Sequence, residues 1–165
     1  MALEIERRFL IKNDNWKEFV TKKIFIEQGY LSKNLDGWII RIRSYGNDYK
    51  IALKKHIESF TNFEFEYSIP QKDGEKIMAN LSNTIKKERF FLEIEKKSWI
   101  IDCFKEKNYP LKIAEIELEN EEEDLSLPSF ISKEITGLIH YSNFSLSIKP
   151  FSTWKDDYLT TLKKH

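Results

Sequence analysis

The 165-residue sequence has only one cysteine, Cys103, so it can form neither an intramolecular disulfide nor a zinc site made from several cysteines. Its three histidines, at positions 56, 140 and 165, are scattered and lack the spacing of paired metal ligands. No apolar run is long enough for a membrane-spanning helix, and charged residues interrupt the N-terminal stretch that a signal peptide would require. We therefore expect a soluble, cytoplasmic protein with no membrane partner.

The sequence has five glycines, and they are too far apart for the glycine-rich turns of nucleotide-binding folds. The G-x-S-x-G turn of α/β-hydrolases is also missing. The formal net charge is zero, because 27 basic residues balance 27 acidic ones, so there is no overall attraction to nucleic acid. These absences argue against the common nucleotide-binding and hydrolase-triad folds and against a nucleic-acid partner.

Alternation of apolar and polar residues dominates the chain and predicts β-strands. The hydrophobic fraction of 41% is enough for a packed core, and the length fits a single domain over residues 1–165. Turn sequences separate several strands, namely Asp36-Gly37, Gly46-Asn47-Asp48 and Lys72-Asp73-Gly74. The expected strands are Leu3–Ile11, Ile24–Leu31, Trp38–Tyr45, Tyr49–Lys55, Phe63–Ile69, Lys87–Glu95, Trp99–Phe104 and Lys112–Glu119. The pattern predicts an α+β fold that is mainly antiparallel β, a meander or barrel of about eight strands.

Helical spacing is confined to short segments. Apolar residues at 77, 78, 81 and 85 predict a helix that begins after Asp73-Gly74, and Asp14 is expected to cap a short helix containing Trp16. Two further helices are predicted over Pro128–Ile139 and Thr153–Leu162. We expect the helices to cover apolar strand faces from outside.

Charged residues recur in doublets of like sign on one face of five predicted strands. For a single doublet a solvated outer face is the ordinary explanation, but its repetition favours a functional surface. Paired carboxylates suit Mg²⁺ or Mn²⁺, and paired arginines and lysines suit phosphate oxygens. The bases are Arg8, Arg41, Arg43, Lys54, Lys87 and Arg89, and the acids are Glu4, Glu6, Glu64, Glu66, Asp102, Glu115 and Glu117. A barrel with both sets in its interior would hold metal and polyphosphate side by side.

The order of these residues resembles the CYTH family, or triphosphate tunnel metalloenzymes. The resemblance runs from Glu4 to about Asn143 and implies an eight-stranded tunnel-like barrel with a charged lumen and helices outside. It rests on Glu4-Ile5-Glu6-Arg7-Arg8, Gln28-Gly29-Tyr30, Arg41-Ile42-Arg43, Lys54, Glu64-Phe65-Glu66, Lys87-Glu88-Arg89, Asp102, Glu115-Ile116-Glu117 and Tyr141-Ser142-Asn143. Arg8 departs from the family's usual lysine, and the planar fork of arginine is not equivalent to an ammonium at a phosphate site.

The resemblance also implies roles for individual residues. Mg²⁺ or Mn²⁺ would be held by Glu4, Glu6, Glu66, Glu115 and Glu117, and a triphosphate by Arg8, Arg41, Arg43, Lys54, Lys87 and Arg89. Lys87 is the first candidate for a catalytic role, and Glu64 and Asp102 would orient the bases or a metal-bound water. Tyr30 would lie near the tunnel mouth, although a core tyrosine with a bonded hydroxyl fits it equally well.

The resemblance implies metal-dependent hydrolysis of a small-molecule triphosphate. Inorganic tripolyphosphate is the favoured substrate, because the single domain shows no evident nucleobase pocket. The open alternatives are a class IV-type adenylyl cyclase, a thiamine or nucleoside triphosphatase, and a non-catalytic polyphosphate or nucleotide sensor. An RNA-binding barrel is disfavoured by the balanced charge and the lack of an aromatic and basic stacking strip. A homodimer is expected if outward apolar faces stay uncovered.

Overall fold

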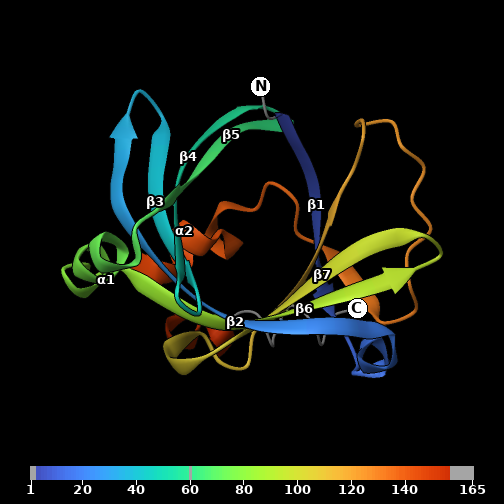
Figure 1. Ribbon diagram of the computed structural model, residues 1–165. Helices are drawn as coiled ribbons and strands as arrows, with labels where there is room; N and C mark the ends of the chain where they lie inside the picture. The colour runs from blue at the N-terminus through green and yellow to red at the C-terminus, as the bar shows by residue number, and fades with distance from the viewer. Residues whose placement is uncertain (1–2, 60, 157–165) are drawn as a thin grey trace.

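The computed structural model describes residues 3–59 and 61–156, apart from the side chains of residues 32–35. Its described part contains nine strands, and all of their pairings are antiparallel (Figure 1). The strands are β1 (Leu3–Ile11), β2 (Val20–Leu35), β3 (Trp38–Tyr45), β4 (Asp48–Glu58), β5 (Thr61–Ile69), β6 (Thr84–Ile94), β7 (Lys97–Phe104), β8 (Lys112–Glu117) and β9 (Ile131–Glu134).

Eight of these strands close into a barrel. The sheet order is β5-β4-β3-β2-β6-β7-β8-β1, and β1 pairs back onto β5 through Leu3↔Phe63, Glu4↔Asn62 and Ile5↔Thr61. Closure removes the free edges that an open sheet would expose. The predicted eight-stranded antiparallel barrel is therefore confirmed, and every strand expected from the alternation occurs.

The prediction of a helix over Pro128–Ile139 is wrong, because part of this segment forms β9. The backbone of β9 pairs with the far end of β1, at Phe9↔Glu134 and Ile11↔Ile131. Phe130 and Ile131 bury their side chains in a core cluster. The free energy gained from this strand pairing and side-chain burial outweighs the weak local preference for helix in so short a segment.

The helices are short. They are η1 (Asn15–Phe19), α1 (Gln71–Ala79), η2 (Glu106–Asn108), η3 (Ile139–Tyr141), α2 (Asn143–Ile148) and η4 (Phe151–Thr153), where η denotes a 3₁₀ helix. The helix expected at Asp14 is η1, but the Asp14 side chain makes no capping bond and pairs instead with Lys17 and Lys112. Of the helix predicted over Thr153–Leu162, residue 153 ends η4 and residues 157–162 lie outside the described part.

Two of the three predicted turns are confirmed. Asp36 and Gly37 join β2 to β3 with φ of 55° and 81°, the left-handed pair of a type I′ hairpin turn. Gly46 has φ of 64° at the turn between β3 and β4. The turn predicted at Lys72-Asp73-Gly74 is wrong, because these residues lie inside α1, and Ile85, predicted on that helix, belongs to β6.

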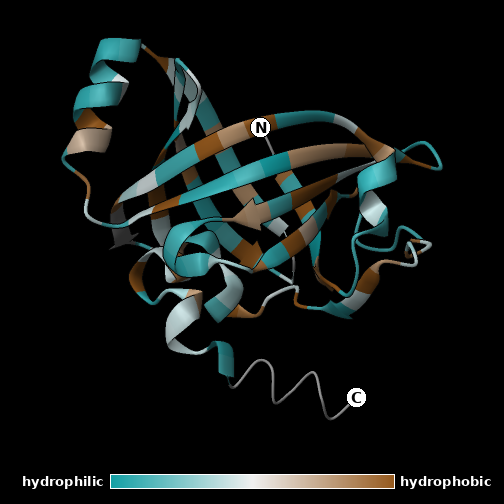
Figure 2. Cartoon of the chain, turned by 90° about the horizontal axis from the view of Figure 1, so that it is seen from below, coloured by the Kyte–Doolittle hydropathy of each residue, from teal (hydrophilic) through white to brown (hydrophobic). Residues whose placement is uncertain are grey.

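Hydrophilic and hydrophobic residues alternate along the strands, seen in Figure 2 as teal and brown stretches. Because successive side chains point to opposite sides of a strand, this alternation gives the barrel an inner and an outer face. Leu10, Phe104 and Ile113 share the inner face with charged residues nearer the other end of their strands. They pack with Ile85, Leu111, Ile135, Tyr141, Leu146 and Phe151 in an apolar cluster. One end of the lumen is thus filled by apolar side chains, and the charged residues occupy the rest.

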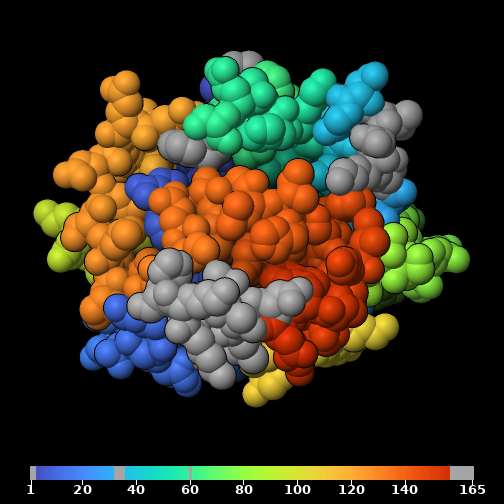
Figure 3. Space-filling view, turned by 180° about the vertical axis from the view of Figure 1, so that it is seen from behind, coloured from blue at the N-terminus to red at the C-terminus, as the bar shows by residue number. Residues whose placement is uncertain are grey.

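The outer face is only partly covered. Around β1, β6, β7 and β8, Trp16 of η1 and Phe130 pack in one cluster with strand residues such as Trp99. α1 packs on β3 and β4 from outside, as expected, whereas α2 contacts the buried end of the lumen beside β6. Figure 3 shows the orange and red C-terminal segment spread across the rear face. Within the described residues, no helix is long and apolar enough to cross a membrane.

The outer face of β3–β5 carries Trp38, Phe63 and Phe65 as half-buried side chains, with Tyr67 exposed. Phe65 lies 6.1 Å from Trp38 and 6.3 Å from Phe63 between ring centroids. The homodimer, which was expected if outward apolar faces such as this one stay uncovered, is not tested by a single chain and stays a prediction.

We predict that Gly74→Ala destabilises the protein, although alanine normally favours a helix over glycine. A Cβ at Gly74 would lie 2.2 Å from Cγ of Tyr49, which is far inside van der Waals contact. Overpacking of this kind costs about 1–3 kcal/mol, which exceeds the helix-propensity gain of about 1 kcal/mol. Thermal melting should show a lower Tm, whereas Asp73→Ala at the exposed neighbouring position should change it little. An increase in Tm for Gly74→Ala would contradict the close packing of α1 on β4.

Candidate functional site

A cavity of about 510 Å³ occupies the charged part of the lumen. Ten of the residues predicted for the site line it together: Glu4, Glu6, Arg8, Tyr30, Arg41, Arg43, Lys54, Glu64, Arg89 and Glu115. They come from β1, β2, β3, β4, β5, β6 and β8, so residues up to 111 positions apart in the chain meet in one space. The inward orientation predicted from the alternation is what brings them together.

Four predicted residues lie elsewhere. Lys87 and Asp102 are fully buried behind the wall of the cavity, with 0% of each residue exposed. Glu66 and Glu117 are not among the described residues that line the cavity. The carboxylate of Glu66 lies 2.9 Å from Nζ of Lys50 and 3.5 Å from Nη2 of Arg41. Glu117 is exposed and lies opposite Glu6 across the β1–β8 ladder.

Strand register places opposite charges directly across from each other. Arg8 faces Glu115, Lys54 faces Glu64 and Arg89 faces Asp102. The corresponding ion pairs measure 3.1, 3.5 and 2.8 Å. Cross-strand pairing therefore relieves the repulsion that doublets of like charge would suffer on their own strands.

The deepest of these contacts is the buried group around Asp102. Arg89 holds the Asp102 carboxylate with two hydrogen bonds of 2.8 Å, and Lys87 donates from Nζ to Oδ2 at 2.5 Å. Burial alone would raise the pKa of Asp102, but the charges of Arg89 and Lys87 outweigh it and hold that pKa below its usual value. Burial lowers the pKa of Lys87 to about 7, against the opposing attraction of Asp102. Lys87 also donates to Oδ1 of Asn143, at the cavity wall, at 3.1 Å.

An acidic group lies in the cavity where β1 meets β5. The ammonium of Lys54 contacts Glu4 and lies 3.2 Å from Glu6 and 3.5 Å from Glu64. Burial and then the charge of Glu6 raise the pKa of Glu4 to about 8, against the attraction of Lys54. Burial would also raise the pKa of Glu64, but Arg41 and Lys54 lower it to about 2. Three acidic side chains thus share one ammonium, and the raised pKa of Glu4 favours its protonated form near neutral pH.

This acidic group fits a hard divalent cation in its chemistry. Carboxylate oxygens are the preferred ligands of Mg²⁺ and Mn²⁺, and Glu4, Glu6 and Glu64 already converge on the positive charge of Lys54. Across the described residues, however, no group of three or more acidic, histidine or cysteine side chains has the arrangement of a formed metal site. A cation would therefore have to replace the ammonium of Lys54 among these carboxylates.

Glu115 has a different environment. It lies between Arg8 and Arg89, at 3.1 and 3.4 Å. Burial and the nearby Asp102 would raise its pKa, but the two guanidinium groups lower it below the usual value. The negative charge of Glu115, one of the five residues predicted to bind metal, is thus already compensated by two arginines.

On the basic side of the cavity, some arginine donors have no acidic partner and others have no hydrogen-bond partner among the described residues. Arg43 is 7% exposed, and its guanidinium bonds to the neutral groups of Gln28 and Tyr45. No ion pair to a carboxylate is found for it in the described residues. Burial and then the charges of Arg41 and Arg89 lower its pKa. Buried atoms Nη2 of Arg8 and Nε of Arg41 also find no hydrogen-bond partner among the described residues.

Buried cationic donors without acceptors are costly unless a ligand supplies the acceptors. The lining contains five arginine or lysine residues and four carboxylates, so the bases are in slight excess. An anion with several oxygens would satisfy Arg8, Arg41 and Arg43 together. The cavity is therefore suited to bind a polyvalent anion beside a divalent cation.

Sequence analysis missed several residues of the cavity. Its wall includes Thr136–Ile139, the end of the stretch predicted as helix, and Ser142–Ser145 at the start of α2, of which Ser142 and Asn143 were noted within a motif but given no role. Ser142 accepts a hydrogen bond from the backbone N–H of Ser145 and caps α2. Gln28 was noted within a motif but given no role, and it is buried at 0% exposure between Arg43 and Tyr30. Its position two residues before Tyr30, on the same strand face, was the available signal.

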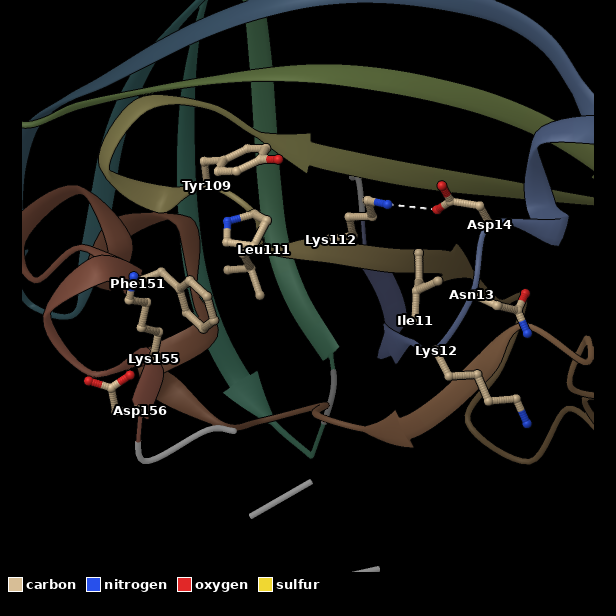
Figure 4. A pocket seen from close by; sticks show the side chains of 11 residues that line it. Ile11, Lys12, Asn13, Asp14, Tyr109, Leu111, Lys112, Phe151, Lys155 and Asp156 are labelled. Carbon is tan, nitrogen blue, oxygen red and sulfur yellow. Dashed lines mark hydrogen bonds and ion pairs between the residues drawn. The ribbon is translucent and has the colours of Figure 1, made fainter. Parts of the chain in front are cut away.

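A second hollow of about 600 Å³ lies outside the lumen, between the end of β1 and the η2–β8 region (Figure 4). It contains none of the predicted site residues. Of its two acidic residues, Asp14 is paired with Lys112 at 2.6 Å, the dashed contact in Figure 4, and with Lys17 at 2.7 Å. The chemistry of the molecule is concentrated in the lumen instead.

Comparison with known proteins agrees with this geometry. No family model matches the chain. An inorganic triphosphatase from Acetivibrio thermocellus is 30% identical over 158 residues, which cover 94% of this chain and 100% of that protein.

Solved structures show the same fold. The crystal structure of the inorganic triphosphatase NE1496 has a TM-score of 0.65 at 25% identity, over 90% of this chain and 96% of that one. A Hippeastrum protein described as a putative adenylyl cyclase with a dominant triphosphatase activity has a TM-score of 0.56 at 15% identity, over 74% and 81%, and supports the fold alone.

We predict that tripolyphosphate in the presence of EDTA raises the Tm of the wild-type protein and that Arg43→Met removes at least about half of this shift. A ligand at a hundred times its Kd stabilises a protein by about 2.7 kcal/mol, roughly 5–10 °C for a chain of this size. Loss of a charged hydrogen bond of about 1.5–3 kcal/mol should weaken binding at least tenfold.

Lys17→Met makes the same change of charge at an exposed site outside the cavity and serves as the control. An equal Tm shift in wild type and Arg43→Met would show that the anion binds elsewhere.

Proposed function

Because the chain belongs to the CYTH family of triphosphate tunnel metalloenzymes, we propose that it hydrolyses inorganic tripolyphosphate in its β-barrel lumen with Mg²⁺ or Mn²⁺. The family and the triphosphatase chemistry expected from the sequence are confirmed by the relative that matches over its full length. The substrate named for that relative and for the matching crystal structure supports the choice of an inorganic triphosphate. The metal and the roles of individual residues are part of the proposal.

One observation carries the proposal. Arg43, with its buried guanidinium and no carboxylate partner among the described residues, lies in the same cavity as the acidic group around Lys54. Arg8 and Arg41, each with a buried donor atom that finds no partner among the described residues, line that cavity as well. A triphosphate chain supplies the acceptor oxygens that these three arginines lack, and the carboxylates can hold the cation that accompanies it.

Arginine at position 8 suits this arrangement. Nε of Arg8 donates to Glu115 at 3.1 Å, and Nη1 donates to the carbonyl oxygen of Tyr141 at 3.2 Å. Nη2 then remains for a phosphate oxygen. A lysine would have one nitrogen for all three contacts, so the exchange to arginine anchors the side chain without giving up the anion-binding donor.

The remaining residues orient the bases. Asp102 fixes the Arg89 guanidinium through two hydrogen bonds, and Glu64 holds Arg41 through Oε1 at 2.8 Å. In this proposal they are positioning residues, which keep the donors in place before substrate arrives and so reduce the reorganisation needed during reaction. Lys87, the first catalytic candidate, lies behind Asn143 and reaches the site through its hydrogen bond to that side chain.

Glu4 and Glu6 are the residues that would hold the divalent ion, with Glu66, Glu115 and Glu117 as the further ligands proposed from the family pattern. A bound Mg²⁺ or Mn²⁺ supplies neutralisation of phosphate charge and activation of water. Occupation by the ion would release Lys54 to pair with phosphate oxygens. The basic residues stabilise the charge that spreads over the transferred phosphoryl group.

Phosphate release tests the activity directly. We expect release from tripolyphosphate with Mg²⁺ or Mn²⁺, none in EDTA, and slower release from ATP and pyrophosphate. The same reactions should be assayed for cyclic AMP, since its formation from ATP would favour the adenylyl cyclase alternative. Tight tripolyphosphate binding without any release in saturating metal would contradict hydrolysis and favour a sensor.

We further predict that metal affinity depends on pH through Glu4. The Glu4 carboxyl, with its pKa raised to about 8, carries a proton at pH 7 that a cation must displace. Affinity for Mn²⁺ should therefore rise by up to about tenfold per pH unit below pH 8 and level off above it. Calorimetry in buffers of different ionisation enthalpy should detect the released proton at pH 7.

Glu4→Gln should abolish this proton release, whereas Glu75→Gln, on the exposed side of α1, should retain it. A pH-independent Mn²⁺ affinity in the wild-type protein would be evidence against Glu4 as a ligand.

A further inference from the structure

Gln28 is a fully buried polar side chain that links two residues of the cavity. It lies on β2 with 0% exposure and is not among the described residues that line the cavity. Its Oε1 accepts a hydrogen bond from Nε of Arg43 at 3.1 Å, and its Nε2 donates to Oη of Tyr30 at 2.8 Å. A buried amide with both ends bonded is held in one orientation.

The chemistry of arginine determines which way this amide points. A guanidinium has only donors, so the group that faces Nε of Arg43 must be the carbonyl oxygen of Gln28. The amide nitrogen must then face Tyr30, and because it is only a donor, Oη of Tyr30 must accept from it. The chain Arg43–Gln28–Tyr30 therefore has a fixed hydrogen-bond polarity.

This polarity leaves the proton of the Tyr30 hydroxyl to be donated elsewhere. Burial raises the pKa of the phenol, so the proton is retained at neutral pH. The ring is held at its edge by Phe144, with 5.2 Å between centroids and an interplanar angle of 87°. No acceptor for this proton is found within the part of the chain that the structure describes, and Tyr30 lines the cavity.

We propose that Gln28 is a positioning residue that, anchored by Arg43, forces the Tyr30 hydroxyl to act as a donor toward a phosphate oxygen in the cavity. This inference rests on the proposed function, because the acceptor is an oxygen of the bound triphosphate. An amide at position 28 is required for it. A carboxylate would still pair with Arg43 but would accept the Tyr30 proton and turn it away from substrate.

A double-mutant cycle tests this inference with the full-length protein. Gln28→Glu keeps the shape of the side chain and reverses the polarity of its bond to Tyr30. We expect Gln28→Glu and Tyr30→Phe each to lower kcat for tripolyphosphate by about tenfold to a hundredfold, the value of a hydrogen bond to a charged group. The double variant should be no more than about threefold slower than Tyr30→Phe, since position 28 acts through the tyrosine.

Gln71→Glu adds the same charge on the exposed side of α1 and should leave kcat unchanged. If Gln28→Glu lowers the Tm so far that folding is in doubt, Gln28→Met replaces it in the same cycle with the same expected non-additivity. Equal losses from the position 28 exchange in the wild-type protein and in the Tyr30→Phe variant would overturn the inference.

Failure of the proposed function would be seen separately, as absence of phosphate release by the wild-type protein. In that case the cycle is measured on tripolyphosphate affinity in EDTA by calorimetry. Coupling between positions 28 and 30 in that affinity supports the inference, and additive effects overturn it.

Discussion

The site depends on the short pairing between β1 and β5 that closes the barrel. It consists of Leu3↔Phe63, Glu4↔Asn62 and Ile5↔Thr61, and it brings Glu4 and Glu6 next to Lys54 and Glu64. Without closure Glu4 and Glu6 would lie at the opposite edge of the sheet from Lys54 and Glu64, and exposure to water would remove the burial that raises the pKa of Glu4. The raised pKa of Glu4 and the clustering of carboxylates for a cation are therefore consequences of the topology.

Charge in the lumen is compensated unevenly, and this unevenness suits the site to its chemistry. Asp102 and Glu115 are fully paired with bases. Arg43, in contrast, has no acidic partner among the described residues, and Nη2 of Arg8 and Nε of Arg41 have no hydrogen-bond partner there. Buried charge without compensation reduces stability, and a bound polyanion recovers that loss as binding free energy. The free protein is thus prepared for an anion, with the bases held in position by acids behind them.

The apolar cluster at one end of the lumen has a role in this preparation. It fills the barrel where Leu10, Phe104 and Ile113 continue the charged faces, and it supports Tyr141 and α2. The residues before and within α2 in turn form part of the cavity wall, including Asn143 beside Lys87. A walled cavity strengthens the electrostatic interactions in it, because the surrounding protein screens charge less than bulk water does.

The sequence by itself determined the strands, the inner face and most of the site. Period-2 alternation is a local property, so it placed ten of the predicted residues correctly on the cavity lining. Tertiary structure decided what depends on contacts between distant segments. β9 formed where helix was predicted because its backbone pairs with β1, and Gly74, expected in a turn, lies inside α1 where Tyr49 packs against it. Three-dimensional packing, which no single strand encodes, buries Lys87 and Asp102 behind the cavity lining. It also sets the direction of the hydrogen bonds that link Arg43, Gln28 and Tyr30.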